Sequence, residues 1–256
     1  MEFVPLLEFD NDRMALIEPS IHHKNINPPE RCVMPFYASV IIKLKNDKTL
    51  EKIYELEPAG VLLSPIDVYK INSGSDDVSV VFPGLGAPLT AALFEELIAL
   101  GCRKFVACGS CGVLKPELKR GVVVIPNSAV RDEGTSFHYC PPGRTIEMEP
   151  EVTRKMEAVL QRHNVPYEVG KTWTTDGFYR ETRGKITKRK AEGCITVEME
   201  CAALLAVAKF RGVVFGQYLG AGDDVSGDVW DPRRVEDRLT FQEKLFWLSV
   251  EAVLNL

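Results

Sequence analysis

Residues 78–112 read VSVVFPGLGAPLTAALFEELIALGCRKFVACGSCG and contain two apolar runs separated by a helical pattern. The runs Val78–Phe82 and Lys104–Cys108 predict strands that are covered on both faces of a sheet. Between them, residues 88–100 carry leucine and alanine at helical spacing, and Gly101 is the usual residue at a helix end. A strand, a helix and a second strand in this order predict an α/β crossover unit.

The same alternation continues to the C-terminus, so we expect a largely parallel or mixed central sheet. No repeat, low-complexity tract or long linker marks a boundary, which favours one domain over residues 1–256. Its first stretch, about residues 1–35, is rich in Pro, Asn and His and is expected to be irregular. The further predicted elements are strands at Val122–Ile125, Tyr167–Thr172 and Val213–Leu219, and helices at Met199–Phe210 and Phe241–Leu254.

Composition argues against several classes of protein. A net charge of −5 disfavours general binding to nucleic acid, which needs a basic surface. No apolar run reaches the ~18 to 20 residues that span a bilayer, and the N-terminus lacks the basic start of a secretory signal, so we expect no membrane partner and a cytoplasmic location. The seven cysteines are scattered in apolar stretches, which favours reduced thiols over a disulfide framework.

Two glycine-containing turns follow predicted strands. Gly84-Leu85-Gly86-Ala87-Pro88 opens a predicted helix, so its amides are placed to approach an anion or a hydroxyl, although a plain tight turn also fits. It lacks the third glycine of a dinucleotide fingerprint. In the second turn, Cys108–Gly112, the hydroxyl of Ser110 and the amides around Gly109 lie at the carboxyl edge of the sheet, where α/β proteins bind ligands. The C-x-x-C spacing there has no second pair or nearby histidine, so we expect no metal and no redox cofactor.

Carboxylates gather in two other motifs. In Val197-Glu198-Met199-Glu200 they precede an apolar helix, where the helix dipole alone would favour them. A buried carboxylate that accepts two hydroxyl hydrogen bonds also orients a ribose, at roughly 1.5–3 kcal/mol for each bond. Gly222-Asp223-Asp224 follows a predicted strand and either supplies a general acid or forms an acidic turn. The polar and aromatic loop Arg131–Tyr139 lines a site, forms an interface or is simply solvated.

In this order the motifs resemble the nucleoside phosphorylase family, which includes uridine phosphorylase, the hexameric purine nucleoside phosphorylases and related nucleosidases. The motif Asp176-Gly177-Phe178-Tyr179 belongs to the resemblance, which covers roughly residues 75–256. It implies a single three-layer α/β/α domain with a mixed, partly barrel-like sheet. It also implies a homo-oligomer, either a dimer or a hexamer built as a trimer of dimers, that acts on a nucleoside with phosphate as co-substrate and without a cofactor.

The resemblance also implies roles for individual residues. Glu200 binds the 2′- and 3′-hydroxyls of ribose, Met199 packs against the sugar, and Phe178 stacks on the base. Asp223 protonates a purine ring nitrogen as the base leaves, so Asp223 and Glu200 are the catalytic candidates. The remaining candidates for substrate binding are Ser110 and Gly109, which face the nucleophile, Glu198 as a ribose or site-shaping group, Gly86 and Arg131.

Two departures from the family pattern concern phosphate. Ala107 stands where phosphorylases commonly have an arginine, and Met34-Pro35-Phe36-Tyr37-Ala38 replaces a Pro-Gly-Asp-Pro loop. Either another cation substitutes, such as Arg131 or Lys43 from a neighbouring subunit, or water is the nucleophile, as in the nucleosidases.

The type of base is also open on the sequence. The loop Arg131–Tyr139 resembles the uridine phosphorylase branch, but residues 180–183 offer no clean counterpart of its uracil-reading Gln and Arg. Asp223 points to purines instead. The leading hypothesis is therefore a purine nucleoside phosphorylase. The alternatives are a nucleosidase, a uridine phosphorylase and an inactive nucleoside-binding protein, and neither His22 nor His23 can be aligned with the family's N-terminal histidine.

Overall fold

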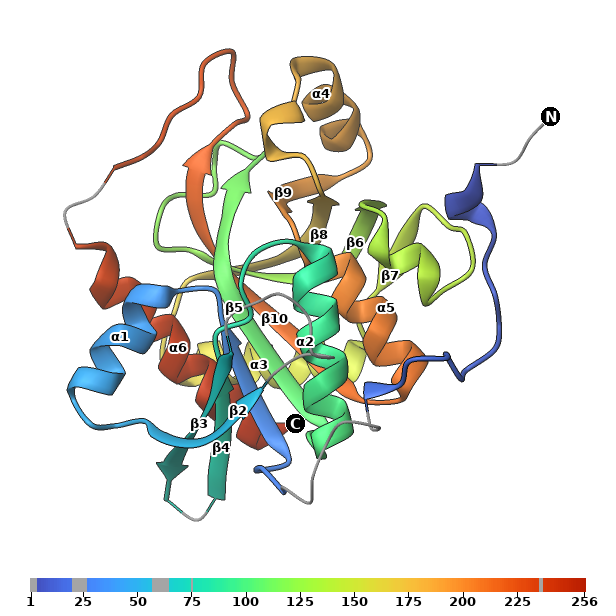
Figure 1. The fold of residues 1–256 in the computed structure, drawn as a ribbon. Coiled ribbons are helices and arrows are strands. Elements are labelled where there is room, and N and C mark those ends of the chain that lie inside the picture. The colour runs from blue at the N-terminus through green and yellow to red at the C-terminus, as the bar shows by residue number, and fades with distance from the viewer. Residues whose placement is uncertain (1–3, 20–26, 57–64, 75, 235–236) are drawn as a thin grey trace.

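The computed structural model describes residues 4–19, 27–56, 65–74, 76–234 and 237–256. Strands and helices alternate along most of this length (Figure 1). In chain order the strands are β1 (Arg31–Pro35), β2 (Glu51–Leu56), β3 (Ile66–Ser73), β4 (Asp76–Val81), β5 (Lys104–Val113), β6 (Val123–Asp132), β7 (Thr145–Glu147), β8 (Tyr167–Thr175), β9 (Cys194–Glu198) and β10 (Val214–Asp224). The helices are α1 (Ala38–Asn46), α2 (Ala87–Leu100), α3 (Pro150–Arg162), α4 (Arg183–Ala191), α5 (Cys201–Arg211) and α6 (Arg238–Asn255), with short 3₁₀ turns η1 (Pro5–Leu7), η4 (Thr135–His138) and η5 (Phe178–Arg180).

The strands form one mixed sheet in which part closes on itself. From β5 the pairing runs through β10, β6, β8 and β9 and returns to β5, so these five strands make a ring. The other flank leaves the ring from β5 through β1, β4, β3 and β2. Pairs such as β5–β10 and β1–β4 are parallel, whereas β5–β9 and β3–β4 are antiparallel. The predicted mixed, partly barrel-like sheet is therefore confirmed.

Helices cover the sheet on both sides and complete the three layers (Figure 1). On one side α2 packs against α5, and on the other α6 packs against α1 and α3. The helix α5 is almost entirely buried, which explains why its sequence is apolar around its whole circumference. At the end of α2, Gly101 takes the left-handed conformation with φ +117°, as predicted for a helix stop.

Two predicted turns are strand ends in the structure, because residues 108–112 lie within β5 and residues 222–224 within β10. The predicted loop Arg131–Tyr139 begins inside β6, which ends at Asp132. The glycines at the ends of β5 and β10 serve close packing between strands, because a Cβ on Gly222 would lie 2.8 Å from the carbonyl oxygen of Cys111. Their glycine content misled the prediction, since glycine marks turns and close backbone contacts alike.

The ends of other predicted elements also shift. Arg31–Pro35 forms β1, so the last five residues of the stretch predicted to be irregular are a strand. The predicted helix at Met199 begins instead at Cys201, because β9 extends to Glu198 and Glu200 is the N-cap. All seven cysteines are free thiols.

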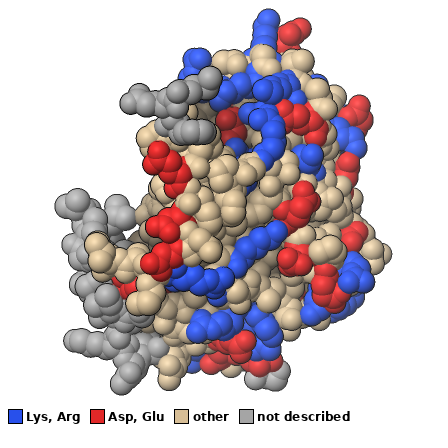
Figure 2. Space-filling model, turned by 90° about the vertical axis from the view of Figure 1, so that its right-hand side faces the viewer, with Lys and Arg blue, Asp and Glu red and all other residues tan. Residues whose placement is uncertain are grey.

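The surface carries both signs of charge. Figure 2 shows acidic and basic side chains interspersed on one face, with Lys and Arg gathered at the top over α4, whose sequence is RGKITKRKA. Within the described parts of the chain, no helix is both long and apolar enough to cross a membrane.

Candidate active site

Glu198 is buried at the end of β9 and serves the backbone at the start of α5. Its Oε2 accepts hydrogen bonds from the amides of Glu200 and Cys201, each at 2.7 Å. Its Oε1 accepts from the hydroxyl of Thr174 at 2.6 Å. The carboxylate thus satisfies amides that a helix start leaves without partners, which is a site-shaping role.

Glu200 is the N-cap of α5 and is only 5% exposed. Its Oε1 accepts a 2.6 Å hydrogen bond from the amide of Gly86, which is the N-cap of α2. The amide of Gly86, predicted to face substrate, is therefore directed at Glu200. Burial first, and then the neighbouring Glu198 carboxylate, raise the pKa of Glu200. One carboxylate thus joins the N-termini of the two helices on this side of the sheet.

The end of β8 lies beside Glu200. The Asp176 carboxylate follows β8 and is close enough to help raise the pKa of Glu200. Asp176 also accepts a 2.8 Å hydrogen bond from the amide of Gly134 and lines a hollow of about 410 Å³ between the start of α2 and η4. Phe178 follows two residues later on η5, is 45% exposed, and has its ring 4.0 Å from that of Tyr179. Met199 is half-buried between Glu198 and Glu200.

Asp223 lies near the end of β10 and is half-buried. Its Oδ2 accepts a 2.7 Å hydrogen bond from the indole N–H of Trp230. Burial, and then the negative charge of Asp223, raise the pKa of Glu181 to about 7. Because Glu181 follows η5 directly, the segment that carries Phe178 lies near Asp223. No sequence motif singles out Glu181.

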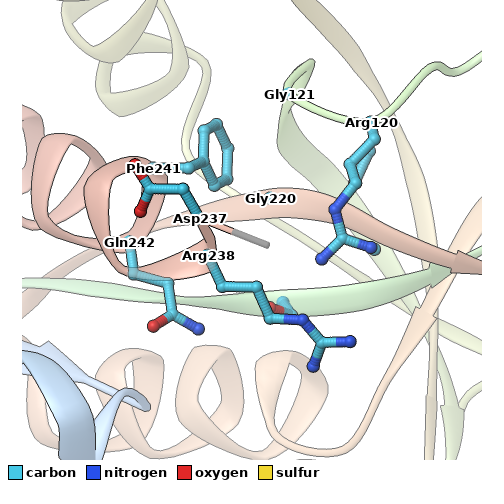
Figure 3. Close-up of a pocket in the computed structure, with 10 residues that line it drawn as sticks. Arg120, Gly121, Gly220, Asp237, Arg238, Phe241 and Gln242 are labelled. Carbon is cyan, nitrogen blue, oxygen red and sulfur yellow. The ribbon is translucent and has the colours of Figure 1, made fainter. Parts of the chain in front are cut away.

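Ser110 faces a cavity of about 220 Å³ between β5, β10 and the start of α6 (Figure 3). Its hydroxyl lies 3.4 Å from the hydroxyl of Tyr37. Neighbouring Gly109 packs against Phe36, whose ring would lie 3.1 Å from a Cβ at that position. Two aromatic residues therefore stand beside the Gly109-Ser110 segment. The cavity also contains Arg120 and Arg238, which no local motif could have revealed because each lies in an ordinary polar stretch.

The two cations predicted as substitutes for the missing arginine are bound to internal partners. Arg131 is buried and donates to the Ser136 hydroxyl at 2.9 Å and to the carbonyl oxygens of Cys140 and Pro141 at 3.1 and 2.7 Å. It fixes the loop after β6 through three of its five N–H donors, and its role in binding substrate stays a prediction. Lys43 forms ion pairs with Asp47 at 2.8 Å and Glu243 at 3.0 Å. His22 and His23 lie outside the described residues.

The structure thus brings most of the predicted residues to one end of the ring of strands. Glu198, Met199 and Glu200 meet Gly86 and Asp176 there, while Asp223 and Ser110 lie on the paired strands β10 and β5. The described residues include no group of His, Cys, Asp and Glu arranged to hold a metal ion.

The chain is similar in sequence to several known phosphorylases. The guanosine phosphorylase of Halorubrum lacusprofundi is 25% identical over 218 residues, covering 81% of this chain and 89% of that protein. A DeoD-type purine nucleoside phosphorylase of Shewanella oneidensis is 28% identical over 74% of the chain and 80% of its own length. The uridine phosphorylase of Treponema pallidum is 33% identical, but the match spans only 56% of the chain and 59% of that protein.

The fold also matches a solved structure. The purine nucleoside phosphorylase of Toxoplasma gondii, in complex with immucillin-H, superposes with a TM-score of 0.74 over 90% of this chain and 92% of that one, at 22% identity. The family model described as the phosphorylase superfamily matches residues 34–245, which include every candidate residue above. The chain therefore belongs to the phosphorylase superfamily.

Proposed function

We propose that this protein is a nucleoside phosphorylase that cleaves the N-glycosidic bond of a purine ribonucleoside. Glu200 is the residue on which the assignment rests, because it is a buried carboxylate fixed by Gly86 at the junction of α2 and α5. A carboxylate has about four lone-pair sites. The hydrogen bonds from the amides of Gly86 and Met199 leave about two of these sites for the 2′- and 3′-hydroxyls of a ribose.

The reaction assigns a role to each of the other groups. An oxygen of phosphate forms a bond to C1′ while the bond from C1′ to the base nitrogen breaks, and the electron pair of that bond passes to the base. Asp223 takes a proton from solvent and passes it to the leaving purine, Phe178 stacks on the base, and Met199 packs against the sugar. The products are the free base and ribose 1-phosphate. Holding the sugar, the nucleophile and the base in line supplies much of the catalysis in such reactions.

Purine nucleosides are the proposed substrate class. The guanosine and purine nucleoside phosphorylases among the relatives align with three quarters or more of their own length, whereas the matched uridine phosphorylase aligns with 59%. We also propose a cytoplasmic homo-oligomer, a dimer or a hexamer, that needs no cofactor apart from phosphate as co-substrate.

Hydrolysis is the second candidate function, and the aromatic residues beside Gly109 and Ser110 favour it. Phe36 and Tyr37 stand in place of the family's phosphate loop, and Ala107 replaces its arginine. In that case water attacks C1′ and ribose is released without phosphate.

Base release from a panel of guanosine, inosine, adenosine and uridine, measured with and without phosphate, separates the two reactions. We expect release from the purine nucleosides that depends on phosphate and yields ribose 1-phosphate. Release at the same rate without phosphate would identify a nucleosidase, and preference for uridine would overturn the purine assignment. Nucleoside binding without release under either condition would indicate a binding protein.

A further inference from the structure

The cavity beside Ser110 lies between the sheet and the start of α6. On its sheet side, Gly220 and Gly222 of β10 contribute no side chains and Ser110 and Ala221 contribute small ones. The opposite side comes from the start of α6, where Phe241 lies so close to Gly220 that a Cβ there would be 2.6 Å from its ring. The volume of about 220 Å³ is large enough for a small ion together with its hydrogen-bond partners.

Two arginines enter this cavity from segments that are far apart in the sequence. Figure 3 shows Arg120 reaching in from the loop before β6 and Arg238 from the first turn of α6. Burial first, and then the positive charge of Arg238, lower the pKa of Arg120, which means that the two guanidinium groups lie near each other.

Neither arginine is neutralised by an ion pair within the described residues. Arg120 donates to the carbonyl oxygen of Arg233, and Arg238 makes no hydrogen bond or ion pair with any described residue. The cavity also contains Asp237, but its two oxygens accept from the amide and the hydroxyl of Thr240, at 3.1 and 2.6 Å, to cap α6. Among the described residues, the cavity therefore combines two mutually repelling cations with Asp237, which caps α6, and with the nearby charge of Asp223, which offsets part of the repulsion at Arg120. The two guanidinium groups favour the entry of an anion.

Neutral donors complete the lining. Ser110 places its hydroxyl at the edge of the cavity. Gln242 accepts a 2.9 Å hydrogen bond from Ser39 through its Oε1, which leaves the NH₂ group of the same amide as a donor. Guanidinium groups offer paired N–H donors that match the oxygens of phosphate.

We propose that this cavity binds the phosphate co-substrate, with Arg120 and Arg238 as its principal ligands. The assignment rests on the proposed phosphorylase function and names the cations that replace the arginine absent at position 107. Arg131 and Lys43 are committed to partners elsewhere in the chain, whereas Arg120 and Arg238 adjoin Ser110, the residue expected to face the nucleophile.

Direct binding of inorganic phosphate to the full-length protein tests the site without relying on activity. Isothermal titration calorimetry would compare the wild type with Arg120→Met and Arg238→Met. We expect each substitution to weaken phosphate binding by about 10- to 100-fold, the range for loss of one charge-assisted contact. Arg154→Met is the matched control, because Arg154 is exposed on α3, paired only with Glu151, and carries the same charge.

Kinetics provide a second readout. The Arg238→Met variant should raise the KM for phosphate by a similar factor and change the KM for the nucleoside by less than about threefold. The Arg238 side chain forms no hydrogen bond or ion pair with a described residue, so this variant remains informative even if Arg120→Met disturbs the loop at Arg233. Thermal melting of each variant would identify a loss of folding.

The outcomes separate the site from the function. Unchanged phosphate binding and unchanged KM for phosphate in Arg238→Met would overturn the assignment while leaving the phosphorylase function intact. Phosphate-independent base release by the wild type would instead overturn the function, and calorimetry would still decide whether the cavity binds phosphate. If the variants lose only the ability to bind a nucleoside 5′-monophosphate, the cavity recognises a phosphate carried by the substrate and the co-substrate assignment is wrong.

Discussion

Glu198 and Glu200 are chemically identical and two positions apart, yet their carboxylates bind different parts of the backbone. Glu198 ends a strand, so its carboxylate turns back on the amides of Glu200 and Cys201. Glu200 already belongs to the next element and turns toward Gly86. The sequence predicted acidic groups at a helix start, but it could not separate the two roles, because the boundary between β9 and α5 falls between them.

Replacement of Glu200 tests the ribose contact. Glu200→Gln keeps an oxygen that can accept from Gly86 but replaces the other carboxyl oxygen, an acceptor for the sugar hydroxyls, with an NH₂ donor. We expect kcat/KM for the preferred nucleoside to fall by about 100-fold, since a hydrogen bond to the transition state is lost and a buried donor without an acceptor takes its place. Glu200→Ala should be at least as damaging.

Steady-state kinetics on purified variants provide the measurement, with Glu117→Gln on the exposed loop after β5 as the control. A melting temperature close to that of the wild type would show that Glu200→Gln is folded. Near-normal turnover in such a folded variant would mean that the ribose is held elsewhere.

At the scale of elements, the start of α5 depends on a small buried network. The Thr174 hydroxyl donates to Glu198 and also accepts from the amide of Ala202 at 3.0 Å. Together the two side chains from β8 and β9 satisfy three of the amides that open α5. Since α5 is buried along almost its whole length, water cannot replace these hydrogen bonds when the network is lost. The amides at the start of α5 then stay without acceptors.

Truncation of that network should destabilise the protein more than a surface substitution does. We expect Glu198→Ala to lower the free energy of unfolding by about 2–4 kcal/mol, because buried amides lose their acceptor. Thr174→Val should cost about 1–2 kcal/mol, since it removes a single bridging hydroxyl. Urea unfolding followed by circular dichroism measures both, with Glu117→Ala as the control. A Glu198→Ala protein as stable as the wild type would contradict the capping role.

The first parts of several strands were predictable, whereas their carboxyl ends were not. Apolar runs predicted β4 and the first parts of β5, β6 and β10, because strands covered on both faces exclude polar residues. The polar and glycine-rich ends of β5 and β10 have the composition of turns. They remain strand because β10 and β5 pair with each other from Val214 opposite Lys104 to Asp224 opposite Val113. Local composition does not encode this long-range pairing.

At the scale of the whole molecule, the closed ring of strands decides which residues meet. The glycine and carboxylate motifs were visible in the sequence because each is a short pattern. Arg120, Arg238 and Tyr37 reach the same place only because β1, β5 and β10 are neighbours and α6 folds back across them. These arginines also create a local positive field in a protein of net charge −5, which overall composition could not reveal.

Buried acids should also make the stability of the whole molecule depend on pH. Burial and the charge of Asp223 raise the pKa of Glu181 from its usual 4.5 to about 7. The folded state therefore holds this proton more tightly than the unfolded state. The associated stability is fully present below about pH 4.5 and is lost as the pH rises through 7.

Glu181→Gln, which cannot lose a proton, should remove this dependence. The free energy of unfolding of the wild type should fall relative to that of the variant between pH 4.5 and 7. Above pH 7 the two free energies should change in parallel. The difference should be on the order of 1 kcal/mol, because solvent screens a partly exposed group. Urea unfolding of both proteins from pH 4.5 to 8 measures it, and contributions from Glu198 and Glu200 cancel because both proteins retain them. Curves that stay parallel over the entire range would show that Glu181 ionises in the folded protein as freely as in the unfolded chain.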